Sequence, residues 1–488
     1  MPATQPSTSN GTPNGAQPAP ARPGPASAPI AQDAAGSPSG PPPGPPQQPP
    51  APPLENLESP DNLDEEDLQD GGRHRRPLEK QASYREVFAV REFRALFVAQ
   101  VLSYAGDQFA QVAIALLVYD RTHSAFLTGL AYALTYLPPI IGGPLLSGLA
   151  DRLPRRLIMI VCDLIRAALV AGMAIPRVPF TALCTLLFFT VMLGPPFTSA
   201  RSALMPEVLP GDKFVLGSAI GNISYQASQI VGFVAGAAVV AVLDPSRTLG
   251  LDALTFVLSA GIVSIWVKRR SAPAREEGNQ PSLWRAMLTG AKLVFRNPML
   301  RSLLLFGWLA GFYILPEGLA APYVHALGGT TLDVGLLMAA MPIGTVVGAF
   351  AFGRLFPPSS RVRVMGWLAM LTCAPLVACA AHPPLWVVLA LFALSGVGGA
   401  YQLVAASAFV VSVPNTARAS SIGLAQSGLL AAQGVGILIG GAAAQAIGPQ
   451  MVVALSGLVG LTCATMLALG WTHRRTQVIA EMRSRAES

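Results

Sequence analysis

Twelve long apolar stretches separated by short polar loops dominate the chain from about residue 94 onward. Each is close to the ~20 residues that an α-helix needs to cross the hydrocarbon core of a bilayer. The pattern predicts an all-α membrane protein with twelve transmembrane helices, and an even number of spans places both chain ends on one side. The expected spans are 94–118, 125–149, 157–176, 179–199, 215–243, 249–267, 302–323, 331–353, 362–381, 384–411, 420–445 and 449–470.

Basic residues are unequally divided between the two sets of loops. One set carries only Arg121, Arg177 and Arg247. Because positively charged loops stay in the cytoplasm, we expect a multi-pass protein of the cell (plasma) membrane with both termini cytoplasmic. The basic set comprises 73–94, Arg152, Arg155, Arg156, Arg201, Lys213, the cluster from Lys268 to Arg301, Arg354, Arg361, Arg363, Arg418 and the tail from Arg474.

The longest loop divides the spans six and six. We expect a six-helix bundle over 86–268, a cytoplasmic linker over 269–300, and a second six-helix bundle over 301–472. The linker segment SLWRAMLTGAKLVF has the pattern of an amphipathic helix at the membrane surface. Residues 1–85 form a Pro-rich tail with an acidic and then a basic segment, which is expected to be disordered, and 473–488 form a basic tail.

Composition narrows the function classes. The chain is 52% hydrophobic and 12% charged, about half the charge of a soluble protein. No HExxH, Walker or nucleophile-elbow motif occurs, and the five cysteines lie inside apolar runs. We therefore expect no enzyme, no metal site and no cofactor. The basic pI near 9.4 is explained by membrane topology, so we expect the lipid bilayer and a small-molecule substrate as partners, no nucleic acid, and a monomer.

Ionisable residues inside apolar spans are costly, at about 2.5–3.5 kcal/mol on insertion scales, and usually face a cavity. Asp107 lies near the middle of the first span, and Glu317 lies deep in the seventh, directly after the helix-kinking Pro316. Asp163 and Arg166 are one turn apart in the third span. These four are the proton-coupling candidates, although Asp163 and Arg166 could equally form an internal neutralising pair.

Uncharged polar residues form further stripes. Tyr104, Gln108 and Gln111 share one helical face with Asp107. We expect Asp252, near the outer end of the sixth span, to be reached by water and to be structural. The substrate-cavity candidates are Tyr104, Gln108, Gln111, Asn222, Gln226, Tyr313, Tyr401 and Gln402, with Phe188, Phe189, Tyr323, Met338 and Met341 as apolar lining or as ordinary packing.

The loop SGLADRLPRR, between the second and third spans, resembles the signature G-x-L-A-D-R-x-G-R-[RK] of the major facilitator superfamily. Ser147 and Pro154 replace its two glycines. The resemblance covers about residues 88–472 and implies a fold of two pseudo-symmetric six-helix halves. It also implies a conformational latch, in which Asp151 meets the eleventh span and Arg155 an acidic partner, with Glu207 and Asp163 as candidates. The latch residues are Asp151, Arg152, Arg155 and Arg156.

Within the superfamily, the segments VLSYAGDQFAQVAIALLVYDRTHS, CDLIRA, GPPFTSARSALMPEVLP and LDALTF resemble the branch of enterobactin exporters and macrolide-efflux proteins. We expect a secondary active, proton-coupled exporter of amphipathic small molecules, of drug or siderophore type, driven by a proton or cation gradient. The fourth span lacks the arginine of proton-coupled antiporters, since 178–200 contains none, which leaves the coupling ion open. A facilitator importing a small solute and a non-transporting scaffold or sensor remain alternatives.

Overall fold

The computed structural model describes residues 83–150, 153–270, 283–414 and 417–472. Regular structure in these ranges is helical, in agreement with the expected all-α class. Most of the N-terminal tail, the C-terminal tail, part of the linker, and Asp151 and Arg152 of the expected latch lie outside the described residues.

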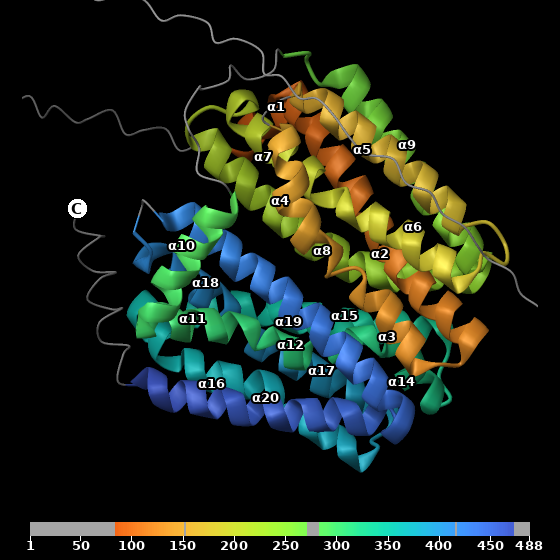
Figure 1. The fold of residues 1–488 in the computed structure, drawn as a ribbon, viewed down its shortest axis with the longest axis vertical. Helices are drawn as coiled ribbons and strands as arrows, with labels where there is room; N and C mark the ends of the chain where they lie inside the picture. Colours follow the sequence, from red (N-terminus) through yellow and green to blue (C-terminus); the bar gives the residue numbers. More distant parts are fainter. Residues whose placement is uncertain (1–82, 151–152, 271–282, 415–416, 473–488) are drawn as a thin grey trace, which may run out of the picture. The chain divides into compact units, whose positions relative to one another are not determined.

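The N-terminal half contains nine helices of the described chain, several of them two parts of one span (Figure 1). They are α1 (Tyr84–Ala89), α2 (Arg91–Thr122), α3 (Ala125–Ala133), α4 (Pro138–Ala150), α5 (Arg155–Met173), α6 (Phe180–Met192), α7 (Gly194–Val208), α8 (Asp212–Leu243) and α9 (Pro245–Trp266).

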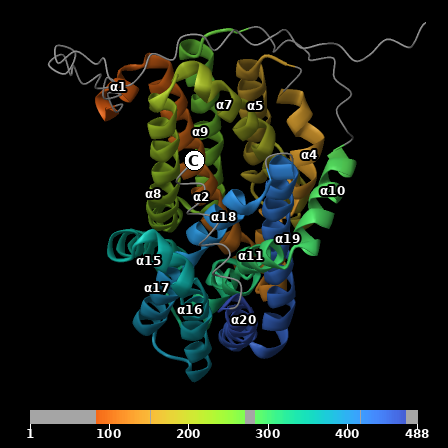
Figure 2. The ribbon, with the colours of Figure 1, turned by 90° about the vertical axis from the view of Figure 1, so that its left-hand side faces the viewer.

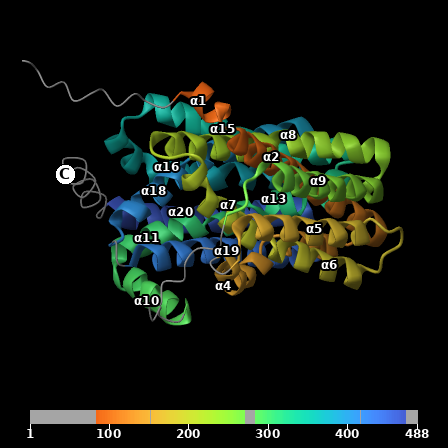
Figure 3. The same cartoon turned by 90° about the horizontal axis from the view of Figure 1, so that it is seen from above.

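The C-terminal half follows the linker helix α10 (Leu283–Arg296), which packs beside α19 at the edge of this half (Figures 2 and 3). Its helices are α11 (Pro298–Trp308), α12 (Ala310–Tyr313), α13 (Leu315–Gly318), α14 (Ala320–Ala326), α15 (Thr331–Leu355), α16 (Pro358–Val377), the 3₁₀ turn η1 (Ala378–Ala381), α17 (Leu385–Gly399), α18 (Tyr401–Ser412), α19 (Arg418–Ile447) and α20 (Pro449–Thr472).

Twelve helical spans run through the two halves, as the apolar pattern predicts. Eleven of them, counted over the described residues, are long and apolar enough to cross a membrane by length and composition alone. Helix α5 is the twelfth. It has 19 residues, but Arg155, Arg156, Asp163 and Arg166 lower its hydropathy, and it packs between α7 and α9. A span of this kind is tolerated because protein, rather than lipid, surrounds its charges.

Several spans are broken near their middle, where proline or a close contact interrupts the backbone ladder. The fourth span changes from α6 to α7 at Leu193, just before Pro195 and Pro196. The seventh is a series of short helices, α11 to α14, with Pro316 inside α13. Proline has no N–H to donate and clashes with the preceding turn, so the kink predicted beside Glu317 is present.

We call the face of the bundle that bears Arg94, Arg155, Arg270, Arg354 and Arg363 the basic face, and the other the opposite face. The helix ends assign each loop to one of them. Helices α2, α5, α8 and α16 begin at the basic face, whereas α3, α6, α9 and α15 begin at the opposite face.

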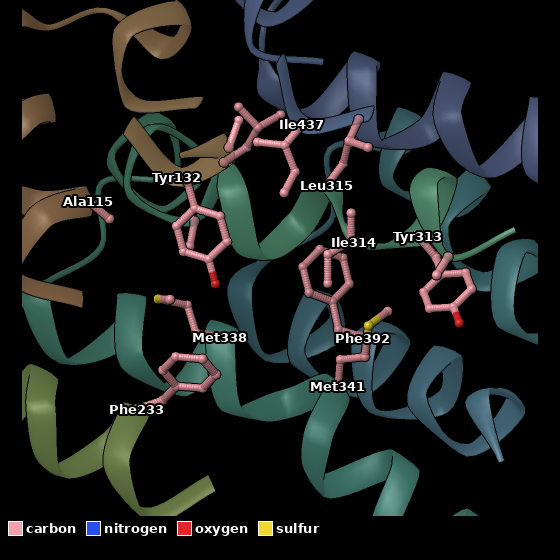
Figure 4. Packing of buried hydrophobic residues seen from close by; sticks show 14 of the residues in the cluster. Ala115, Tyr132, Phe233, Tyr313, Ile314, Leu315, Met338, Met341, Phe392 and Ile437 are labelled. Atoms are coloured by element: carbon pink, nitrogen blue, oxygen red, sulfur yellow. The ribbon is translucent and has the colours of Figure 1, made fainter. Parts of the chain in front are cut away.

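The two halves pack together in the part of the bundle nearer the opposite face. Helix α3 lies against α19 so closely that a Cβ on Gly129 would be 3.0 Å from Gly441 Cα. Helix α8 lies against α15, where Gly335 contacts Ala237 and Phe233. Small residues allow helix backbones to approach in a membrane protein. Figure 4 shows this buried seam, formed by side chains of both halves, among them Ala115, Tyr132, Phe233, Met338, Leu315 and Ile437.

Candidate functional site

An ion pair inside the N-terminal half is the centre of the candidate site. Arg166 Nη2 of α5 lies 2.5 Å from Asp107 Oδ1 of α2. The guanidinium also stacks on Phe256, 4.1 Å from the ring centroid, and Arg166 Nη1 donates to Ser103 Oγ at 3.4 Å. The Arg166 side chain is 7% exposed and the Asp107 side chain 31% exposed. Asp107 is therefore the member of the pair that solvent reaches.

Two more carboxyl groups lie beside this pair. Asp163 is fully buried and accepts a hydrogen bond from Ser259 Oγ at 2.6 Å. Asp252 of α9 is 1% exposed and accepts from Thr255 Oγ1 at 3.2 Å. The expectation that water reaches Asp252 is wrong, because α2 covers it: a Cβ on Gly106 would collide with Asp252 Oδ1.

One guanidinium thus faces three carboxyl groups. Asp163 and Asp252 both interact electrostatically with Arg166 and with Asp107, but in this structure Arg166 pairs with Asp107. The internal pair between Asp163 and Arg166, one of the two interpretations of the sequence, is not formed. Because a buried carboxylate is costly without a partner, the set is suited to exchanging partners or protons.

A polar cavity between α2, α7 and α8 leads to this pair. Its wider part has a volume of about 310 Å³ and is lined by residues near the basic-face ends of the helices, including Met205, Phe214 and Ser218. Its inner part, about 60 Å³, is lined by Asp107 and Arg166. The two parts share four lining residues, Gln100, Tyr104, Thr198 and Arg201. The inner cavity at the ion pair therefore adjoins the wider cavity, which lies toward the basic face.

Arg201 corrects the prediction for the fourth span. The sequence pattern ends this span at residue 199, but the helical span continues to Val208 and contains Arg201. The apolar pattern placed this arginine in the basic set of loops, beyond the expected end of the span. Its positive charge indicated the topology of the chain, but the sequence did not show that Arg201 lines a cavity.

Glu317 lies at the seam between the halves. It is 4% exposed, and Tyr132 of α3 lies within hydrogen-bonding distance, with its hydroxyl oxygen 3.2 Å from Glu317 Oε2 and 3.1 Å from Gln111 Oε1. The hydroxyl has one hydrogen for two acceptors. All three groups are satisfied when Glu317 carries a proton, or when the Gln111 amide is turned so that its NH₂ group faces the hydroxyl.

The polar candidates of the C-terminal half form a hydrogen-bonded cluster. Tyr401 donates to Phe306 O at 2.9 Å, and Gln402 Nε2 donates to Tyr313 Oη at 2.7 Å and to Gly307 O at 3.0 Å. Tyr401 is fully buried. These side chains join α18 to α11 and α12 across the breaks in the seventh and tenth spans. The apolar candidates Tyr323, Met338 and Met341 are likewise buried in the core.

The remaining cavity candidates are divided between two environments. Tyr104 and Asn222 line the cavity. Gln108 is 4% exposed and packs against α8, where a Cβ on Gly232 would lie 2.6 Å from Gln108 Cβ. Gln226, one turn beyond Asn222 on α8, is half-buried. The polar stripe of α2 is therefore divided: Tyr104 lines the cavity, whereas Gln108 contacts α8.

Charged residues at the basic face form a second network. Arg155 pairs with Glu207, the first of the two partners considered, and Arg270 pairs with Glu92 and with Glu207. The hydrogen bonds to Glu92 raise the pKa of the Arg270 guanidinium above its ordinary value, so this cation stays charged at every physiological pH. Arg156 donates to the carbonyls of Val263 and Ser264. The network joins α2, α5, α7 and α9 at their ends.

The described residues contain no group of three or more His, Cys, Asp or Glu side chains placed to hold a metal ion. The sequence matches the family model described as Major Facilitator Superfamily over residues 96–355 and 318–485. The chain belongs to the major facilitator superfamily.

Three of the curated relatives that the chain resembles are efflux proteins or exporters by name. The chain is 25% identical over 282 residues to macrolide efflux protein A of Streptococcus pyogenes, covering 56% of this chain and 69% of that protein. It is 24% identical over 367 residues to the multidrug efflux pump Tap of Mycolicibacterium fortuitum, covering 72% and 89%. It is 23% identical over 322 residues to the enterobactin exporter EntS of Shigella boydii, covering 64% and 76%.

Solved structures of superfamily transporters share the fold. A bacterial homologue of the human lysosomal transporter Spinster, in an inward-facing and unoccupied conformation, superposes with a TM-score of 0.63 at 15% identity, covering 81% of this chain and 99% of that one. A POT-family transporter superposes with a TM-score of 0.63 at 12% identity, covering 79% and 97%. These structures show that the fold is shared; with the family match and the membrane-spanning helices, the chain is a multi-pass membrane transporter of the major facilitator fold.

Proposed function

We propose that this superfamily member is a secondary active exporter that moves amphipathic small molecules out of the cell in exchange for protons. The efflux activity named for three relatives supports the direction of transport. The observation that carries the proton coupling is the Asp107–Arg166 pair, which lines the inner cavity and has Asp163 and Asp252 buried beside it.

In this proposal the basic face is cytoplasmic, because positively charged loops are retained in the cytoplasm. The cavity then opens to the cytoplasm, and the packed seam closes the outer side. This is the state of an exporter that is ready to take up substrate. Alternating access requires the α3–α19 and α8–α15 contacts to separate while the basic-face ends approach.

The proton acts on the partner choice of Arg166. A proton that reaches Asp107 from outside removes its negative charge and weakens the ion pair, which frees Arg166 to pair with Asp163 or Asp252. Release of the proton to the cytoplasm restores the pair seen here. One elementary charge crossing about 100 mV releases about 2.3 kcal/mol, which supports roughly a fortyfold substrate gradient.

The experiment uses inside-out membrane vesicles and an amphipathic fluorescent drug. An acidic vesicle interior corresponds to the outside of the cell, so protons leaving the vesicle should drive drug accumulation inside it. Asp107→Asn removes the titrating group but keeps its size. We expect this variant to lose pH-driven accumulation while it still exchanges drug between the two sides at equal pH.

Asp212→Asn is the matched control, because Asp212 is an exposed carboxylate at the basic-face end of α8. It should accumulate drug like the unaltered protein. Undiminished pH-driven accumulation by Asp107→Asn would show that this carboxylate does not carry the proton. Uptake into right-side-out vesicles, instead of inside-out ones, would identify an importer.

A further inference from the structure

Arg201 lies inside the fourth helical span and lines the polar cavity without an anionic partner. Arg155, Arg166 and Arg270 each pair with a carboxylate. Over the residues that the structure describes, Arg201 forms no ion pair and no hydrogen bond, and its Nε is buried without a partner. A cation inside a membrane span is costly when it stays unpaired, which indicates that something outside the chain completes this site.

The surroundings of Arg201 leave its guanidinium open to the cavity. Helix α8 passes it at Gly221, where a Cβ would lie 3.3 Å from Arg201 Nη2 and 3.8 Å from Gln100 Oε1. The absence of a side chain at Gly221 therefore makes room beside both polar groups. Gln100 is 3% exposed, and its Oε1 also lacks a hydrogen-bond partner, so two unsatisfied polar side chains lie together in the cavity wall.

The rest of the wall combines hydroxyl groups with aromatic rings. Thr198, Ser202 and Ser218 line the same cavity. Tyr104 and Tyr225 meet edge to face, with ring centroids 5.0 Å apart. Ligand sites typically combine such apolar surfaces with a few polar groups that orient the ligand. The rings provide the contact area for a planar apolar group, and Arg201 provides the charge.

We propose that Arg201 binds the anionic group of the transported molecule, so that the substrates include amphipathic organic anions with an aryl group and a carboxylate or similar oxyanion. A guanidinium presents a planar fork of donors that matches a carboxylate. The Nε2 group of Gln100 and the nearby hydroxyls are the donors for further hydrogen bonds to the anion, and the aryl group lies against Tyr104 and Tyr225. The site rests on the proposed exporter function and names its substrate class.

Occupation of this site also affects closure of the cavity. Enclosing a guanidinium that has no partner is unfavourable, since the charge loses water without gaining an anion. A bound carboxylate removes this cost. The cavity with a bound anion therefore closes more readily than the empty cavity. This effect of the ligand acts through Arg201 and requires no contact between Arg201 and Asp107.

The test measures binding to the purified full-length protein in detergent by isothermal titration calorimetry. The probes are 2-naphthoate and its neutral isostere 2-naphthamide. The unaltered protein should bind 2-naphthoate at least about tenfold more tightly, as expected for a charge-assisted hydrogen bond. Arg201→Gln should remove this preference, Arg201→Lys should retain part of it, and Arg363→Gln, at an exposed position on α16, should leave it unchanged.

Gly221→Leu gives a second test that keeps the arginine. A leucine side chain would fill the space beside the guanidinium, so both probes should bind more weakly.

Equal affinities for the two probes in the unaltered protein, or an unchanged preference in Arg201→Gln, would overturn the proposal. The binding measurement does not depend on transport, so the two proposals can fail separately. If vesicles accumulate drug but the two probes bind equally, the anion site at Arg201 is refuted and the exporter function stands. If the preference for 2-naphthoate depends on Arg201 but no pH-driven transport occurs, the exporter function is refuted and the anion site stands.

Discussion

The two halves of the molecule share a six-span plan but use polar residues in opposite ways. The N-terminal half encloses Asp107, Asp163, Arg166 and Asp252, and a small cavity lined by Asp107 and Arg166 adjoins a wider one toward the basic face. The polar cluster of the C-terminal half consists of uncharged side chains that bond to one another and to backbone carbonyls, as Tyr401 does with Phe306 O.

This difference indicates a division of labour. A charged group can exchange partners when several neighbours interact with it at similar strength. The N-terminal half provides three carboxyl groups for one guanidinium. Uncharged hydrogen bonds to the backbone fix helices in place, as in the C-terminal half. Glu317 of the second half lies at the seam and contacts Tyr132 of the first half. Four variants test this contrast.

Arg166→Gln should have the largest effect. It leaves Asp107, Asp163 and Asp252 without their shared cation, and removing one partner of a buried pair costs about 3–5 kcal/mol. We expect a large drop in the thermal stability of the detergent-solubilised protein and in its membrane level. Adding Asp107→Asn should restore much of the stability but not pH-driven transport. A stable single variant with normal transport would contradict the central role of this pair.

Gly129→Val should come next, because it acts on the seam. Its Cβ would lie 3.0 Å from Gly441 Cα, and overpacking of this kind costs about 1–3 kcal/mol. The closed seam should lose population by about tenfold or more. Nitroxide labels at Arg247→Cys and Leu332→Cys, in a background without native cysteines, should report a longer distance. Gly143→Val, where no atom lies within 4 Å of the added Cβ, should not lengthen it.

The fold was predictable from the sequence because it depends on a strong repeated signal. Runs of apolar residues near bilayer length located every span, and the third was found from its apolar length despite its charges. The extent of the fourth span was less accessible. The apolar pattern ended this span at residue 199, but the helical span continues to Val208, because a broken span can continue when neighbouring helices cover the backbone.

The candidate site was predictable only in part. Depth within a span identified Asp107 and Glu317, because a carboxylate at mid-membrane depth needs a special environment. The environment of Asp252 depends on Gly106 of another helix, and that contact leaves no local pattern in the sequence. For the same reason, Tyr401 and Gln402 could not be separated from cavity-lining residues: a polar stripe looks the same whether water or a backbone carbonyl faces it.

Glu317→Gln tests whether the seam carboxylate belongs functionally with the charged half. The amide still hydrogen-bonds to Tyr132 but no longer binds or releases a proton. Neutral hydrogen bonds contribute about 0.5–1.5 kcal/mol, so we expect transport to slow by up to about tenfold while the dependence on the pH gradient remains. Complete loss of pH dependence, matching that of Asp107→Asn in the same vesicles, would place the proton on Glu317 and remove the contrast between the halves.

Tyr401→Phe should have the smallest effect, because it should leave the transport rate and its pH dependence unchanged. The variant loses one hydrogen bond to Phe306 O, and single interhelical hydrogen bonds in membrane proteins average about 0.6 kcal/mol. We expect a slightly lower midpoint of thermal unfolding, with transport rate and pH dependence retained, because the hydroxyl holds two helices together in a buried environment. If substrate affinity fell while thermal stability stayed the same, Tyr401 would have to reach the substrate. The C-terminal half would then contribute to binding, and its uncharged cluster could not be treated as purely structural.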